Sequence, residues 1–83
     1  MKEVTYSRAA AKALTRMPAN DCKRIMEKIE QYADNPASLA ANVTALKDRD
    51  GKRLRIGDWR AIFDETETAI AVLVIGPRGS VYE

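Results

Sequence analysis

The sequence predicts an α+β fold, in which a first strand and two helices precede a three-stranded antiparallel meander and an extended tail. Three observations support this prediction. Residues 22–33 carry apolar side chains at helical spacing, residues 53–64 alternate around a Gly-Asp turn, and residues 69–75 are apolar throughout. We expect the helical hairpin to pack on one face of the sheet.

Length and composition predict a single domain covering residues 1–83. The 83 residues are too few for a second core, and 46% hydrophobic with 31% charged residues is typical of a globular chain. The longest apolar run, residues 69–75, is far shorter than the ~20 residues of a membrane helix. The segment after Met1 lacks the apolar core of a signal peptide, so we expect a cytoplasmic protein with no membrane partner.

The residue types exclude several kinds of site. Cys22 is the single cysteine and the chain has no histidine. An internal disulfide, a structural zinc site and a histidine-activated nucleophile are therefore excluded. We expect no metal site and no cofactor.

The N-terminal elements follow from alternation and capping. Apolar and polar side chains alternate over residues 3–6, which predicts a short strand. Ser7 suits the N-cap of the following helix, and Pro18 ends that helix. Its apolar stripe comprises Ala10, Leu14 and Met17.

The second helix has the clearest periodicity of the chain. Asn20 or Asp21 suits its N-cap, and Asn35-Pro36 ends it. Its apolar stripe comprises Cys22, Ile25, Met26, Ile29, Tyr32 and Ala33. The short connection predicts an antiparallel helix pair, with Cys22 an inert part of the core. Residues 37–50 form either a helical turn or a packed loop.

A tight turn at Gly57-Asp58 sets the register of the first hairpin of the meander. With this turn, Arg55 faces Arg60 and Arg53 faces Ile62. The return strand is expected over residues 59–64, followed by a turn at 65–68. The apolar run 69–75 is typical of a strand covered on both faces.

Alternation along this hairpin places Arg53, Arg55 and Arg60 on the face opposite the apolar one. Residues 47–60 contain six basic and three acidic residues, a net charge of +3. Like charges facing each other destabilise a sheet, so this gathering has no evident structural reason. One interpretation is a solvated face. The other is an anion-binding platform for phosphates, because guanidinium groups bind phosphate oxygens in a bidentate manner.

Two residues near the C-terminus are further candidates. Arg78 lies within Gly76-Pro77-Arg78-Gly79, which permits a sharp exit from the sheet and places a cation at its edge. It is either a surface arginine or part of the platform. Tyr82 is either an edge residue or a phenol placed to stack on a base or to donate a proton.

The chain resembles the RelE/ParE toxin superfamily of bacterial type II toxin–antitoxin systems. The resemblance spans nearly the whole chain and rests on the order of elements and on two segments. These are Arg53-Leu54-Arg55-Ile56-Gly57-Asp58-Trp59-Arg60, followed by an acidic turn, and Ile75-Gly76-Pro77-Arg78-Gly79-Ser80-Val81-Tyr82. It implies a RelE-like fold.

In RelE-like members the toxin is a metal-independent endoribonuclease, or mRNA interferase, that cleaves mRNA in the ribosomal A site and inhibits translation. The resemblance implies that Arg60 and Arg78 stabilise the scissile phosphate and that Tyr82 stacks on or orients the substrate. Arg53 matches a catalytic lysine of the best-known member, and Gly51 matches another. Further candidates for RNA or phosphate binding are Lys47, Arg49, Lys52 and Arg55. The implied partners are a cognate antitoxin, the ribosome and mRNA, with operator DNA bound only through the antitoxin.

The chain departs from this pattern in ways that keep two other functions open. Arg53 can neutralise phosphate charge, but its pKa above ~12 makes it a poor general base. Lys52 lies on the opposite face of its strand from Arg53, so it does not replace the missing lysine directly. The alternatives are a ParE-like, non-enzymatic inhibitor of DNA gyrase and a non-toxic protein of this fold that only binds its antitoxin.

Overall fold

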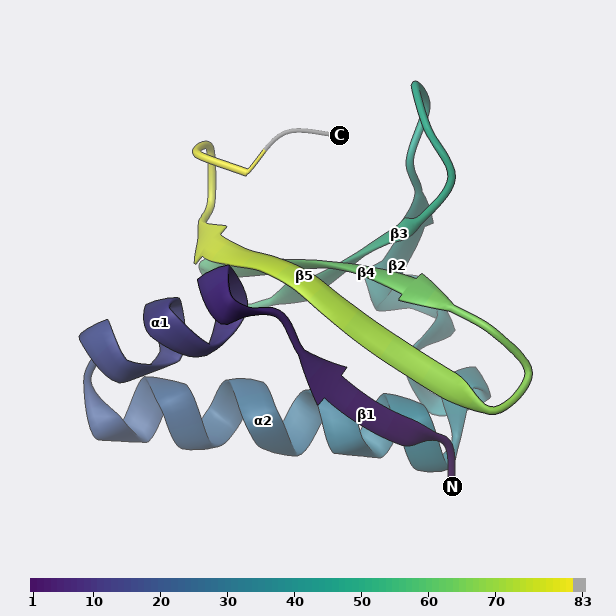
Figure 1. Ribbon diagram of the computed structural model, residues 1–83, viewed down its shortest axis with the longest axis horizontal. Coiled ribbons are helices and arrows are strands. Elements are labelled where there is room, and N and C mark those ends of the chain that lie inside the picture. Colours follow the sequence, from purple (N-terminus) through teal and green to yellow (C-terminus); the bar gives the residue numbers. More distant parts are fainter. Residues whose placement is uncertain (82–83) are drawn as a thin grey trace.

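The computed structural model describes residues 1–81. Its elements follow the order β1 (Glu3–Tyr6), α1 (Arg8–Arg16), α2 (Ala19–Asp34), a 3₁₀ helix η1 (Pro36–Asn42), β2 (Val43–Ala45), β3 (Lys52–Ile56), β4 (Trp59–Glu65) and β5 (Ala69–Pro77). The strands form one sheet in the order β1-β5-β4-β3-β2, with β1 parallel to β5 and the other pairs antiparallel. Figure 1 shows α1 and α2 below this sheet, which leaves its upper face without a helix. The predicted α+β class and its one-sided helical layer are confirmed.

The hairpin of β3 and β4 has the predicted register. Arg55 pairs with Arg60, and Arg53 pairs with Ile62. Gly57, the first residue of the turn, has a φ of +58°, a backbone conformation that glycine adopts without steric cost. The turn chemistry and the alternation of side chains together determined this pairing.

The segment left open between the helices and the hairpin contains two elements. The 3₁₀ helix η1 begins at Pro36 and buries Leu39 against the core. The strand β2 then pairs with β3 through Val43 and Leu54, which adds a fourth antiparallel strand to the expected meander. A strand of three residues is too short to give a readable alternation in the sequence.

The expectation that β5 is covered on both faces is wrong. Val74 is 39% exposed, whereas Ile70, Val72 and Ile75 are buried on the helix side. A bulge shifts the pairing between Ile62–Val74 and Phe63–Val72. The strand is apolar throughout although only one of its faces is covered by helices.

The core lies between this sheet face and the two helices. Tyr32 of α2 and Phe63 of β4 form an edge-to-face ring pair with centroids 5.2 Å apart. The buried cluster comprises Ala10, Leu14, Ile25, Ile29, Tyr32, Ala33, Leu39, Leu54, Ile56, Ala61, Phe63, Ile70, Val72 and Ile75. None of the helices within residues 1–81 is long and apolar enough to cross a membrane.

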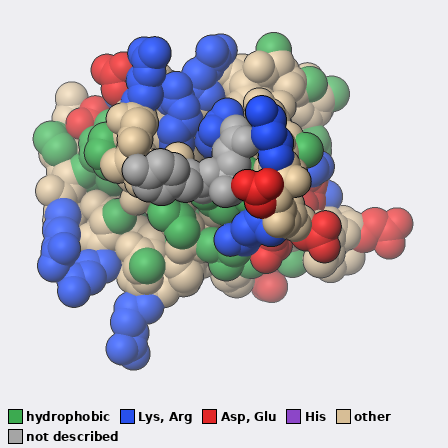
Figure 2. Space-filling model, turned by 90° about the horizontal axis from the view of Figure 1, so that it is seen from above, with side chains coloured by type: hydrophobic (Ala, Val, Ile, Leu, Met, Phe, Trp, Pro, Cys, Tyr) green, Lys and Arg blue, Asp and Glu red, His purple; other side chains and the backbone are tan. Residues whose placement is uncertain are grey.

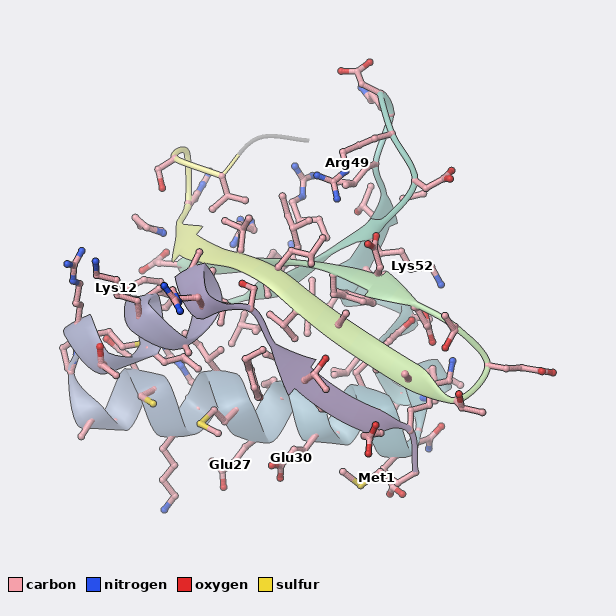
Figure 3. The ribbon with its side chains drawn as sticks, viewed as in Figure 1. Met1, Lys12, Glu27, Glu30, Arg49 and Lys52 are labelled. Atoms are coloured by element: carbon pink, nitrogen blue, oxygen red, sulfur yellow. The ribbon has the colours of Figure 1, made fainter. Side chains whose placement is uncertain are left out.

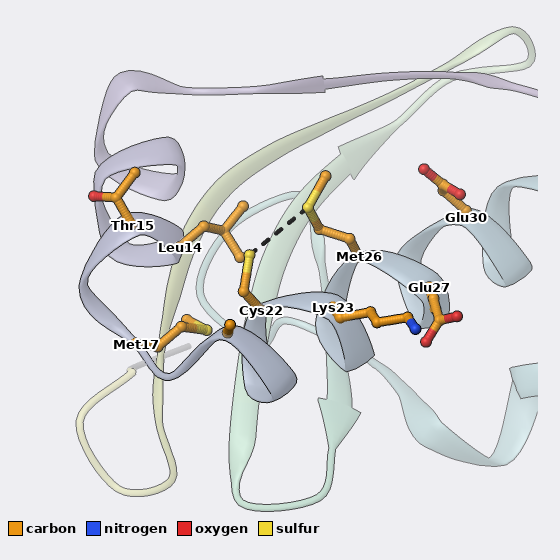
Figure 4. Close-up of a pocket in the computed structure, with 9 residues that line it drawn as sticks. Leu14, Thr15, Met17, Cys22, Lys23, Met26, Glu27 and Glu30 are labelled. Carbon is orange, nitrogen blue, oxygen red and sulfur yellow. Dashed lines mark hydrogen bonds between the residues drawn. The ribbon is translucent and has the colours of Figure 1, made fainter.

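Cys22 is half-buried rather than enclosed in the core. It lines a groove of about 580 Å³ formed by the end of α1 and the first half of α2. Its Sγ lies 3.9 Å from Sδ of Met26, and Figure 4 shows both sulfurs at the groove. The periodicity correctly placed Cys22 on the apolar side of α2. It did not predict that this part of the helix lines an open groove.

Candidate anion-binding site

The helix-free face of the sheet carries a hollow lined by arginines. Its volume is about 190 Å³, and its walls come from the end of η1 and from β2, β3 and β4. The lining residues are Ala41, Asn42, Thr44, Arg53, Arg55 and Arg60. Figure 2 views this side of the molecule and shows several Lys and Arg side chains on it.

Pairing across β3 and β4 brings the three guanidinium groups together. Arg55 and Arg60 are direct partners, and Arg53 lies two residues from Arg55 on the same side of β3. Ile62, the partner of Arg53, is only 3% exposed on this face. Arg53 and Arg60 are half-buried and Arg55 is exposed, so the three positive charges remain accessible from solvent.

The side chain of Arg60 is held at the hairpin turn by hydrogen bonds to backbone carbonyl oxygens. Its Nη1 donates hydrogen bonds of 2.9 Å to the carbonyl oxygens of Gly57 and Trp59. Burial lowers the pKa of Arg60 from its ordinary value, as do the positive charges of Arg78, Arg53 and Arg55, against a smaller opposing effect of Asp58. Among residues 1–81, Arg60 has no carboxylate within 4.0 Å. The site therefore concentrates positive charge that an anion would neutralise.

The segment after β5 places Arg78 beside the same turn. The backbone amide of Arg78 donates a 2.7 Å hydrogen bond to the carbonyl oxygen of Asp58. A Cβ on Gly76 would lie 2.6 Å from Cγ2 of Val81, so glycine permits the chain to fold back here. Arg78 is exposed, and its charge acts on Arg60. Tyr82, the other predicted C-terminal residue, lies outside the described residues.

The loop between β2 and β3 carries the predicted residues Lys47 and Arg49. Both are exposed, and neither lines the hollow. Arg49 extends above the sheet (Figure 3), where its Nη2 lies 3.9 Å from Oδ1 of Asp64. The loop ends at Gly51, whose φ is +126°. A side chain there would be strained and would meet Leu46 and Asp64 at 3.1 Å, so a lysine does not fit this position.

Lys52 lies on the opposite face of the sheet from the arginines. Its Nζ donates a 2.7 Å hydrogen bond to Oε1 of Glu65. Tyr32 donates a 2.7 Å bond to the same oxygen, and Lys2 donates a 2.6 Å bond to Oε2. Lys52 is therefore engaged in an ion-pair cluster beside the core, and the structure does not bring it to the hollow.

The Glu65 cluster is a feature that the sequence reading missed. Burial raises the pKa of Glu65, but the bonds from Lys2, Lys52 and Tyr32 outweigh it and lower that pKa to about 2. Burial and the bond to Glu65 raise the pKa of Tyr32. Glu65 follows Phe63 by two residues, so alternation placed its carboxylate on the apolar side, where a buried acid requires cationic partners.

The described residues offer phosphate binding more clearly than proton transfer. Among residues 1–81, no group of three His, Cys, Asp or Glu side chains could hold a metal ion. The carboxylate of Asp64 is exposed, and its Oδ1 lies 3.9 Å from Nη2 of Arg49. The arrangement can bind an anion and stabilise charge that develops on its oxygens.

Similarity to solved structures places this fold in a known group, whereas no protein-family profile matches the chain and no curated protein matches it significantly. A chain in the RelE–RelB complex of Pyrococcus horikoshii OT3 superimposes with a TM-score of 0.77 at 26% sequence identity, over 96% of this chain and 98% of that one. The chain has the fold of the RelE-like toxins.

Two further structures have the same RelE-like fold. The toxin–antitoxin complex RelBE2 of Mycobacterium tuberculosis matches with a TM-score of 0.78 at 16% identity, covering 93% of this chain and 98% of that chain. The RelBE toxin–antitoxin complex of E. coli matches with a TM-score of 0.71 at 15% identity, covering 93% and 96%. The RelE-like scaffold here therefore carries an arginine-lined hollow on its helix-free face.

Proposed function

We propose that this chain is the toxin of a type II toxin–antitoxin system and that it cleaves mRNA on the ribosome. The observation that supports this most strongly is the hollow lined by Arg53, Arg55 and Arg60, together with Arg78, whose charge acts on Arg60. Guanidinium groups match phosphate oxygens in charge and geometry. The reaction takes place in the cytoplasm, where the ribosome presents mRNA.

In the proposed reaction, the 2′-hydroxyl of one nucleotide attacks the adjacent phosphorus. The 2′-hydroxyl gives up its proton to water as the new O–P bond forms. The bond to the 5′-oxygen breaks, and this oxygen takes up a proton from water, so the products are a 2′,3′-cyclic phosphate and a 5′-hydroxyl. Arg60 and Arg78 stabilise the negative charge that grows on the phosphate oxygens, and Arg53 neutralises the substrate. No metal takes part in this scheme. Alignment of the RNA by the ribosome and the toxin supplies much of the rate, since proximity contributes up to about 7–11 kcal/mol.

A cognate antitoxin is the second proposed partner. The similar structures are toxin–antitoxin complexes, and a growth inhibitor must be neutralised in its own cell. We infer a small protein with acidic residues that face the basic surface, where opposite charges speed association and set specificity. Operator DNA would be bound through the antitoxin rather than by this chain.

Inhibition of DNA gyrase, as in the ParE branch, is the alternative function. It needs no acid–base pair, and the described residues offer no evident general base for RNA cleavage: the chain has no histidine, and position 51 favours glycine. A protein of this fold that only binds its antitoxin would likewise need no acid–base pair.

A purified translation reaction separates these functions. Mapping of mRNA 5′ ends with and without the protein should show new ends at the ribosomal A site. A parallel supercoiling reaction with purified DNA gyrase should proceed normally. Intact mRNA together with inhibited gyrase would assign the protein to the ParE-like function, and no effect in either reaction would leave antitoxin binding as the function.

A further inference from the structure

The helix α1 carries its charges in a single row. Its charged residues are Arg8, Lys12 and Arg16, spaced four residues apart, so they share one side of the helix; we call them the α1 basic stripe. All three are exposed. The chain has no acidic residue between Glu3 and Asp21, so nothing on α1 itself offsets this charge. Figure 3 places Lys12 at the outer surface of α1.

Helix stability explains only Arg16, whose positive charge in the last turn is favoured by the helix dipole. Like charges four residues apart destabilise a helix. Arg8 is the first residue of α1, where the helix dipole favours an acidic side chain. Within residues 1–81, no member of the stripe has a carboxylate within 4.0 Å. The neighbouring helix differs, because Arg24 of α2 forms an ion pair with Asp21.

The distribution of charge over the whole chain supports a binding surface. The net charge is only +2. The α1 basic stripe contributes three positive charges, residues 47–60 contribute a further +3, and the remaining residues are acidic overall. The small net charge therefore conceals two separate basic regions of the chain, one in residues 47–60 and one on α1.

The surroundings of the stripe favour a nucleic acid over a protein partner. Ala9 and Ala11, which are also exposed on α1, are small and let a polyanion approach the helix closely. No aromatic or large apolar side chain of α1 is exposed beside the stripe to anchor a protein interface. Successive members lie about 6 Å apart along the helix axis, so the row suits a run of phosphates.

The position of α1 relates the stripe to the arginine-lined hollow. Ser7, its N-cap, donates a 2.6 Å hydrogen bond to the carbonyl oxygen of Leu73 in β5. Figure 1 shows α1 beside the end of β5 from which the chain continues to Arg78. The helix α1 therefore lies near the segment that carries Arg78, whereas the hollow lies on the helix-free face of the sheet.

We propose that the α1 basic stripe is a second RNA-binding surface, which contacts the phosphate backbone of ribosomal RNA while the hollow holds the mRNA. This inference rests on the proposed function at the ribosome. The stripe supplies affinity and orientation and takes no part in the bond-breaking step. It reads no sequence, because it meets only phosphates.

The test compares two double variants that remove the same charge. R8Q/R16Q alters the stripe, and K23Q/K28Q alters exposed lysines of α2. Affinity for purified ribosomes is measured over a range of salt concentrations, with circular dichroism to verify folding. We expect R8Q/R16Q to weaken binding roughly 10-fold and to reduce the slope of log affinity against log salt by about 1.5–2. K23Q/K28Q should change both quantities much less.

Other outcomes overturn the inference in distinguishable ways. Equal losses in the two variants would mean that total charge, not the stripe, governs binding. If the stripe variant binds ribosomes normally but no longer retains its antitoxin, the surface belongs to an acidic protein. If the unaltered protein binds neither ribosomes nor a 20-base-pair RNA duplex, the proposed function fails along with the stripe. Normal ribosome binding by the folded stripe variant defeats the stripe proposal alone.

Discussion

The backbone amide of Arg78 donates a 2.7 Å hydrogen bond to the carbonyl oxygen of Asp58, which fastens the segment after β5 to the turn between β3 and β4. Arg60 is held at the same turn through Gly57. Two arginines that are distant in sequence therefore meet at one rigid hairpin end. Because the Arg78 contact is made by its backbone amide, replacement of the Arg78 side chain should leave the geometry of the turn intact. Replacement of Arg60 removes the hydrogen bonds that its Nη1 donates to the turn.

Arg60→Ala should abolish most of the activity while the protein stays folded. Loss of one charge-stabilising group typically costs about 10²–10³-fold in rate. The variant also loses two hydrogen bonds to backbone carbonyls but relieves repulsion from Arg55, Arg53 and Arg78. The free energy of unfolding should therefore change by no more than about 1 kcal/mol. Urea denaturation and mRNA cleavage on ribosomes measure the two effects.

Arg60→Lys is the matched control for charge. A lysine keeps the positive charge but not the planar, bidentate donor geometry, so it should restore only part of the activity. An Arg60→Ala protein that fails to fold would show that the arginine is structural.

Glu65 should make stability depend on pH in the acid range. Its pKa is about 2 in the folded protein, below the ordinary value of 4.5, because Lys2, Lys52 and Tyr32 bond to the carboxylate. The stabilisation is therefore fully present above pH ~4.5 and is lost as the pH falls toward 2. Glu65→Gln should lower the free energy of unfolding at pH 7 by on the order of 2–3 kcal/mol and flatten its decline between pH 5 and 2.

Glu67→Gln is the matched control for this prediction. Glu67 is exposed in the turn two residues later. Denaturation of both variants at several pH values makes the comparison, and only Glu65→Gln should change the pH profile. Identical profiles for Glu65→Gln and the unaltered protein would contradict the role of the cluster.

Substitutions of the adjacent residues Lys52 and Arg53 should have different effects, one on stability and the other on activity. Lys52→Gln removes one of three donors to Glu65, so it should cost about 1 kcal/mol of stability with little effect on cleavage. Arg53→Gln removes a cation from the hollow, so it should slow cleavage with little effect on stability. The reversed pattern would show that the phosphate is bound on the helix side of the sheet.

Local chemistry in the sequence was enough to predict the hairpin and its face of arginines. The Gly57-Asp58 turn fixed the pairing, and alternation then fixed which side chains share a face. Long-range contacts were not predictable in the same way. The parallel pairing of β1 with β5 and the bond from Arg78 to Asp58 join segments far apart in the sequence. The covering of only one face of β5 depends on where the helices pack, which its uniformly apolar sequence does not encode.

The chemical step itself should depend on Arg78 and on the ribosome. Arg78 is exposed and its charge acts on Arg60, so we expect its guanidinium to stabilise charge on the substrate rather than to support the fold. Arg78→Ala should therefore lower the single-turnover rate of mRNA cleavage more than the affinity for ribosomes. Tyr82→Phe tests whether the phenol is needed beyond stacking, because the phenyl ring keeps the stacking surface.

Free RNA should be cut negligibly, because the described residues offer no evident base and the ribosome must align the 2′-hydroxyl with the phosphate. The cleavage step should also be insensitive to EDTA when preformed ribosome complexes are used at an ionic strength that preserves them. Rates on such complexes, on the same mRNA without ribosomes, and with chelator provide the measurement. Efficient cleavage of naked RNA would mean that the chain carries its own proton-transfer group, and Asp64, the carboxylate on the open face, would then be the first residue to replace.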